Sequence, residues 1–206
     1  IALTRHAKEA GADAALVVAP YYNKPTQEGL FRHYEAISKA VDIPIVVYNI
    51  PGRSVIDIGA ETMARIAALP TVVGVKDATG DLSRPLKMRT LVGDKFCQLS
   101  GDDATATAFL AQGGVGCISV TSNVAPRMCA QMHDAWIAGD LKTCFALRDK
   151  LMALHDVMFC ETNPSVPKYM ASLLGKCTPD VRLPLMPLSD ASKPKVEAAM
   201  KAVGLI

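Results

Sequence analysis

The sequence predicts an α/β fold with a parallel β-sheet, because short apolar strands alternate with helical segments from residue 14 to residue 121. Five runs rich in β-branched residues are the strand candidates, at 14–20, 43–49, 71–77, 95–101 and 115–121. Apolar periodicity predicts helices between them, at 27–40, 59–69, 81–92 and 104–112. Crossovers that join parallel strands in this way are expected to be right-handed.

The pattern changes at both ends of this alternating region. Apolar positions from Ile1 to Ala10, followed by Gly11, indicate the last part of a helix, so we expect the chain to begin inside a βα unit. After the fifth strand only helices are predicted, at 126–138, 141–158, 164–175 and 188–203. We therefore divide the chain into a sheet portion, 1–125, and a region of closing helices, 126–206.

Composition and charge limit the kinds of partner that this protein is expected to bind. The 206 residues are 50% apolar, enough for a substantial core, and the net charge of +2 comes from interspersed charges, so we expect neither a nucleic acid nor a membrane as partner. No apolar run has the length of a membrane span. The six cysteines show no CxxC spacing and lie mostly among apolar residues, which is typical of reduced thiols in a cytoplasmic protein. A small molecule or another protein is the expected partner.

Polar residues gather where the predicted strands end. The clusters are Tyr21 to Asn23, Tyr48 and Asn49, Lys76 and Asp77, Ser100 to Asp103, and Ser119 to Asn123. Five parallel strands could form an open doubly wound sheet or part of an eight-stranded barrel. A ring of polar side chains at the carboxyl ends of the strands favours the barrel, where active sites are built in this way. No glycine-rich phosphate-binding loop follows any strand, which argues against a nucleotide-binding sheet.

Lys76 is the most informative single residue, because it follows the apolar run TVVGV. Burial disfavours the charged ammonium and lowers the pKa of a lysine, and the neutral amine can attack a ketone to form an imine. Gly74, two residues earlier on the same strand face, is expected to leave space beside the amine. The alternative interpretation is a lysine at a strand end that reaches solvent or pairs with Asp77.

Two neighbours could support this chemistry. If strands 43–49 and 71–77 are adjacent, the hydroxyl of Tyr48 could approach Lys76 and relay protons; otherwise it is a packed core tyrosine. Arg53, in the loop Pro51-Gly52-Arg53, could bind a substrate carboxylate, although loop arginines are usually just solvated.

Asp102 and Asp103 are favoured as loop and helix-capping residues over a metal site. The remaining candidates, the four histidines, lie on predicted helices as surface or packing residues: His6, His33, His133 and His155.

Taken together, PYYNKPTQEG, YNIPGR, GVKDATGD, LSGDD and GGVGCISVTSN resemble the dihydrodipicolinate synthase family in order and spacing, and FCETNPSVPKYM and VRLPLMPLS extend the resemblance to the C-terminal helices. The resemblance implies a (β/α)₈ TIM barrel, a class I aldolase-type lyase without cofactor or metal, and a homotetramer built as a dimer of dimers. Its substrates would be pyruvate and L-aspartate 4-semialdehyde, in lysine and diaminopimelate biosynthesis. The implied site residues are Lys76 as Schiff-base lysine, Tyr48 as proton relay, Tyr22 reaching a neighbouring subunit, Arg53 on the aldehyde substrate's carboxylate, and Gly101 and Ile118 lining the pyruvate pocket.

The chain also departs from the family pattern. About five of the eight strands are expected here, and the family's early threonine-containing motif has no counterpart. The family's usual glutamate after the active lysine is Asp77, and of its lysine-inhibition site only Tyr21 is found. Two alternatives stay open beside the synthase, a related pyruvate lyase of the N-acetylneuraminate type and a non-catalytic truncated paralogue. Because an incomplete barrel exposes strand edges and its interior, we expect the chain not to be a stable monomer.

Overall fold

The computed structural model describes residues 1–206, which form two compact units, Ile1–Ile118 and Ser119–Ile206. The division that we expect between the barrel portion, 1–125, and the closing helices, 126–206, stays a prediction.

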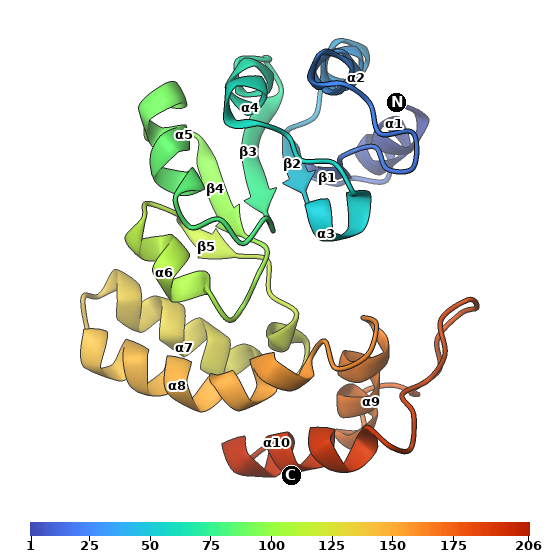
Figure 1. Ribbon diagram of the computed structural model, residues 1–206, viewed down its shortest axis with the longest axis vertical. Helices are drawn as coiled ribbons and strands as arrows, with labels where there is room; N and C mark the ends of the chain where they lie inside the picture. Colours follow the sequence, from blue (N-terminus) through green and yellow to red (C-terminus); the bar gives the residue numbers. More distant parts are fainter. The chain divides into compact units, whose positions relative to one another are not determined.

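The first unit contains a five-stranded parallel sheet whose strands follow one another in chain order (Figure 1). A doubly wound sheet reverses its strand order at a switch point, whereas an unbroken order is that of a barrel wall. The structure therefore supports the barrel. Its elements are α1 (Ala2–Glu9), β1 (Ala15–Val18), α2 (Gln27–Ala40), β2 (Ile45–Asn49), α3 (Pro51–Ser54), α4 (Ala60–Ala67), β3 (Val72–Asp77), α5 (Arg84–Val92), β4 (Cys97–Ser100), α6 (Ala106–Ala111) and β5 (Gly116–Cys117).

Helices α2, α4 and α5 cover one face of this sheet. Ile45, Val47 and Val75 of the strands are buried in one cluster with Leu30 of α2 and Ile66 of α4. Each large apolar side chain buried in this way contributes about 1.5–3 kcal/mol to folding. Alternation along the strands places every second residue in this core, so the remaining strand residues point to the opposite face.

We call that opposite face the inner face; it carries Leu16, Val18, Tyr48, Lys76 and Leu99. It is only partly covered within the chain, since Leu16 and Val18 keep 47% and 40% of their surface exposed. The sheet thus presents a covered side that stabilises it and an accessible side at which the polar strand ends lie.

The second unit is helical. Its core packs Leu151, Leu154, Met170 and Met200 in one buried cluster. Asp140 begins the longest helix by accepting a hydrogen bond from the Thr143 backbone N–H at 3.1 Å. None of the chain's helices is both long and apolar enough to cross a membrane. The elements are the 3₁₀ helix η1 (Thr121–Asn123), α7 (Pro126–Ile137), α8 (Leu141–Val157), α9 (Ser165–Leu173) and α10 (Lys193–Val203).

All five predicted strands are present, with three differences in the elements around them. The strand predicted at 115–121 is shorter in the structure, where β5 spans Gly116–Cys117 and has β4 as its single strand neighbour. The helices predicted to begin at 81 and 188 begin at Arg84 and Lys193 instead, in both cases next to a proline in the first turn. The short helix α3 was predicted as a loop.

Candidate active site

Lys76 lies near the carboxyl end of β3 with its side chain half-buried on the inner face. Asp77 follows it and, by the alternation of the strand, points to the helix-covered face, where its carboxylate accepts a hydrogen bond from Arg84 Nε at 2.9 Å. The interpretation in which Asp77 pairs with Lys76 is therefore wrong. The Lys76 amine is thus separated from the carboxylate of Asp77, the next residue in the chain.

Tyr48 is the direct neighbour of Lys76 across the sheet, as predicted for adjacent strands 43–49 and 71–77. The Nζ atom of Lys76 lies 4.1 Å from the centroid of the Tyr48 ring, so the amine lies over the ring rather than at its hydroxyl. Burial raises the pKa of the Tyr48 phenol, while the nearby positive charge of Arg53 acts in the opposite direction. At neutral pH the phenol therefore carries its proton and can donate it.

Burial also changes the Lys76 amine. Desolvation lowers the pKa of Lys76, and the charges of Cys117 and Asp103 oppose this shift. Burial raises the pKa of Cys117 itself to about 12, so near neutral pH it is an uncharged thiol and only Asp103 favours the ammonium. The balance moves Lys76 toward the neutral, nucleophilic form that was predicted from its place in an apolar strand.

Two glycines shape the surroundings of Lys76 in different ways. A Cβ atom at Gly74 would lie 2.4 Å from the carbonyl oxygen of Cys97, so this glycine lets β3 approach β4. The expectation that Gly74 leaves space beside the amine is therefore wrong. Gly101 has the role expected for Gly74, since a Cβ there would lie 3.2 Å from Cε of Lys76.

The two residues predicted to line a pyruvate pocket lie at neighbouring strand ends. The backbone N–H of Gly101 donates to Asp77 O at 2.7 Å, and that of Ile118 donates to Ser100 O at 2.9 Å. These bonds extend the sheet past the ends of β4 and β5. Their role toward a ligand stays a prediction.

Arg53 lies on α3, directly after β2, with an exposed side chain. The helix ends at Val55, whose φ of +67° is unusual for a β-branched residue and costs of order 1–3 kcal/mol. The Ser54 hydroxyl lies 2.9 Å from the carbonyl oxygens of both Ile50 and Ile56 and holds this turn together. Arg53 is thereby placed near Tyr48, with no ion pair to another residue of the chain.

Tyr22 is the predicted site residue that the structure does not bring to Lys76. Its side chain is 88% exposed and its backbone has a φ of +60°, which is uncommon for a residue other than glycine. The turn is closed by the Asn23 N–H, which donates to Tyr21 O at 2.7 Å. Tyr22 therefore presents its ring to the outside of the chain.

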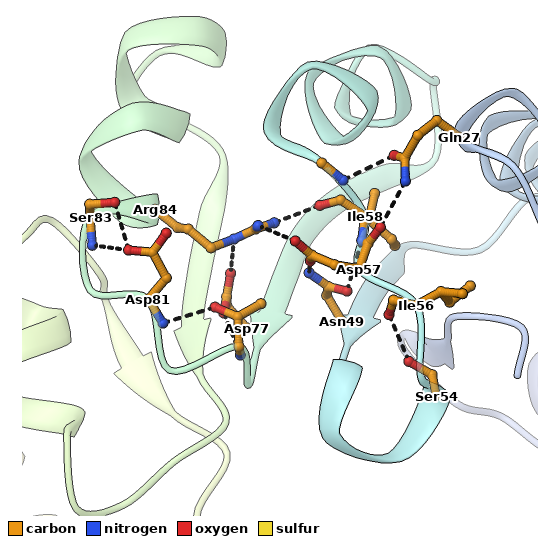
Figure 2. A network of polar contacts seen from close by, with 12 residues as sticks. Gln27, Asn49, Ser54, Ile56, Asp57, Ile58, Asp77, Asp81, Ser83 and Arg84 are labelled. Atoms are coloured by element: carbon orange, nitrogen blue, oxygen red, sulfur yellow. Dashed lines mark hydrogen bonds and ion pairs between the residues drawn. The ribbon is translucent and has the colours of Figure 1, made fainter. Parts of the chain in front are cut away.

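A buried network behind the site was not predicted from the sequence (Figure 2). Arg84, 7% exposed, donates to Asp77 at 2.9 Å, to Asp57 Oδ2 at 3.0 Å and to Ile58 O at 2.6 Å. Asn49 joins it by donating to Asp57 Oδ1 at 2.7 Å. One signal could have revealed Arg84, because a cation in the first turn of a helix opposes the helix dipole and calls for a nearby anion.

The chain is similar to known proteins along its whole length. Residues 1–203 match the model of the Dihydrodipicolinate synthetase family. The chain is 66% identical over its full length to a 4-hydroxy-tetrahydrodipicolinate synthase of Rhodospirillum centenum and covers 71% of that protein. The dihydrodipicolinate synthase structure from Thermotoga maritima has a TM-score of 0.96 and 40% identity, covering 100% of this chain and 71% of that one. The chloride-inhibited enzyme of Acinetobacter baumannii, in complex with pyruvate, has a TM-score of 0.95 and 43% identity, covering 100% and 70%.

Proposed function

The chain belongs to the dihydrodipicolinate synthetase family, and from this premise we propose that Lys76 is the residue that binds pyruvate as a Schiff base. The fold is accordingly part of a (β/α)₈ barrel. The activity is that of a lyase, 4-hydroxy-tetrahydrodipicolinate synthase, in lysine and diaminopimelate biosynthesis. The observation that carries the residue assignment is a half-buried amine with a lowered pKa at the carboxyl end of a barrel strand.

The chemistry begins with the neutral amine of Lys76. Its lone pair adds to the C2 carbonyl of pyruvate, and the resulting carbinolamine loses its hydroxyl as water to leave a protonated imine. The imine withdraws electrons, so the pyruvate methyl group gives up a proton and becomes an enamine carbon. That carbon attacks the aldehyde carbon of aspartate semialdehyde, whose oxygen takes a proton. The amino group of the bound product then displaces Lys76, closing the ring and freeing the lysine.

Tyr48 is proposed as the proton relay of these steps. Its phenol is protonated at neutral pH and its ring lies against the Lys76 amine. The hydroxyl can therefore give a proton to the departing hydroxyl group of the carbinolamine and take a proton back later. The hydroxyl must come closer to the substrate than the ring-face contact with Lys76 brings it. Tyr22, exposed and turned outward, is proposed to extend the relay into a neighbouring subunit of a homotetramer.

Arg53 is proposed to hold the carboxylate of the semialdehyde. It has no ion-pair partner within the chain, and a guanidinium group binds a carboxylate through two parallel hydrogen bonds. Gly101 and Ile118 are proposed to line the pyruvate pocket through their backbones. A cytoplasmic location, expected from the pattern of cysteines, is part of the same proposal.

Borohydride trapping tests the assignment. Incubating the 206-residue chain with pyruvate and borohydride should reduce the imine to a stable secondary amine on the peptide that carries Lys76. The variant Lys76→Ala should give no adduct, whereas Lys87→Ala, which removes an exposed lysine from α5, should be modified like the parent chain. A parent chain without an adduct would overturn the proposal and favour the non-catalytic alternative, and an adduct on another lysine would overturn the assignment of Lys76.

A further inference from the structure

Arg84, the first residue of α5, binds two other segments of the chain from the helix-covered side of the sheet. Its guanidinium binds Asp77 at the end of β3, Asp57 in the segment between α3 and α4, and the carbonyl oxygen of Ile58 (Figure 2). Asn49 at the end of β2 is held by the same segment, since it donates to Asp57 and accepts from the Ile58 N–H at 3.1 Å. The ends of two neighbouring strands are thus connected through one arginine.

These strand ends are the ones that carry the proposed chemistry. Asn49 and Asp77 directly follow Tyr48 and Lys76, and both pairs are register partners in the sheet. Because successive side chains point to opposite faces, the network holds the backbone from behind while Tyr48 and Lys76 project into the site. A shift of Asp77 or Asn49 along its strand would carry the reacting residue with it.

The segment between β3 and α5 directs Arg84 back onto Asp77. Asp77 Oδ1 accepts from the N–H and hydroxyl of Thr79, the Thr79 hydroxyl accepts from the Asp81 N–H, and Asp81 accepts from Ser83. The helix then begins at Arg84. Both carboxylate oxygens of Asp77 are therefore occupied, one by this segment and the other by the guanidinium.

We propose that Arg84 is a positioning residue for the reaction at Lys76: it fixes the ends of β2 and β3 in register and neutralises the carboxylate that follows the nucleophile. The inference rests on the proposed Schiff-base function. It assigns a role to residues outside the inner face, because none of the network's side chains faces the Lys76 amine.

The charge of Arg84 should also affect the pH dependence of imine formation, which a purely stabilising residue would leave unchanged. The groups that face Lys76 are Tyr48 from β2, Cys117 from β5 and Asp103 after β4, with Arg53 acting on Tyr48 from α3. Without Arg84, the buried carboxylate of Asp77 would act on Lys76 as an uncompensated negative charge. It would favour the ammonium, so imine formation would require a higher pH.

The experiment measures the rate of borohydride trapping at increasing pyruvate concentration and at several pH values, in chains whose folding is checked by circular dichroism. In Arg84→Gln, the limiting rate should fall roughly tenfold or more, because small displacements of reacting groups are costly. The pH at which the rate is half-maximal should rise. Arg84→Lys should restore the parent pH midpoint, since an ammonium keeps the positive charge. It should restore only part of the rate, since an ammonium cannot make the same set of hydrogen bonds as the planar guanidinium. Lys87→Gln, on the exposed side of the same helix, should match the parent chain.

Asp57→Asn provides a second variant that disturbs the fold less, because the Asp57 side chain is 47% exposed. It leaves one acceptor oxygen where Asp57 has two, so the side chain can no longer bind both Asn49 and Arg84, while the bond between Arg84 and Asp77 stays. The connection between the two strand ends is thereby broken, and the limiting rate should fall several-fold at an unchanged pH midpoint. Folded Asp57→Asn and Arg84→Gln chains that trap pyruvate with the parent rate and pH profile would overturn the inference. If Arg84→Gln does not fold, Asp57→Asn with the parent rate overturns it alone. A parent chain that traps no pyruvate would instead overturn the proposed function and this inference with it.

Discussion

Replacing Gly101 by alanine should damage the site with only a moderate cost in stability. The new Cβ would lie 2.7 Å from Ala78 Cβ and 3.2 Å from Lys76 Cε, both inside the usual 3.5–4.0 Å contact of carbon atoms. Overpacking of this kind costs about 1–3 kcal/mol. For a chain of this size each kcal/mol lowers the melting temperature by about 2–4 °C. Because Lys76 Cε must move, the limiting rate of imine trapping should fall by more than the loss of folded protein explains.

The assay combines thermal unfolding with pyruvate trapping for Gly101→Ala and two matched variants. Gly52→Ala is the control, since a Cβ at Gly52 meets no atom within 4 Å and should change neither quantity. Gly74→Ala would place its Cβ 2.7 Å from Cys97 Cβ, and should lower stability more than Gly101→Ala does because it forces β3 and β4 apart. A Gly101→Ala chain that melts and traps like the parent would refute the placement of Gly101 against Lys76.

Four further outcomes are expected. Tyr48→Phe should slow trapping by roughly a hundredfold or more, the usual size of a general acid–base contribution, and trapping at the parent rate would remove Tyr48 from the relay. Because the Lys76 pKa is lowered and the neutral amine reacts, trapping should rise with pH and level off below about 10.4, the ordinary lysine value; a rise that continues through that pH would contradict the shift. Arg84→Met should lower the free energy of unfolding in urea by about 3–5 kcal/mol, because Asp77 is left charged and buried, and a loss below 1 kcal/mol would show that the pair is not buried in solution. Light scattering should find the chain associated, since β1 forms an edge of the sheet and carries the exposed side chains of Leu16 and Val18, and a monodisperse, cooperatively melting monomer would refute this.

The sheet and its reactive face were predictable because they depend on local patterns. Runs of β-branched residues locate the strands, and parallel strands bring their carboxyl ends to one edge of the sheet. The sequence therefore predicted that Tyr48 approaches Lys76 if their strands are neighbours, and the structure shows that they are. Whether the strands form a barrel or an open sheet was less certain from the pattern, because it depends on strand order. Polar strand ends and the family motifs decided it.

The network behind the sheet could not be predicted in this way. Arg84 and Asp57 are separated by 27 residues and meet only because the crossover places α5 beside the segment before α4. The role of Gly74 was misjudged for a related reason, since its close neighbour is the backbone of Cys97 on another strand. The helix α3 was missed because four residues beginning with proline show no helical periodicity.

A crystal structure of this chain with pyruvate, determined without reductant, would test the central claim most directly. Continuous electron density should join Nζ of Lys76 to C2 of pyruvate, with the bound molecule against Gly101 and within reach of the Tyr48 hydroxyl. Pyruvate bound without a covalent bond to Lys76, or joined to a different lysine, would contradict the account.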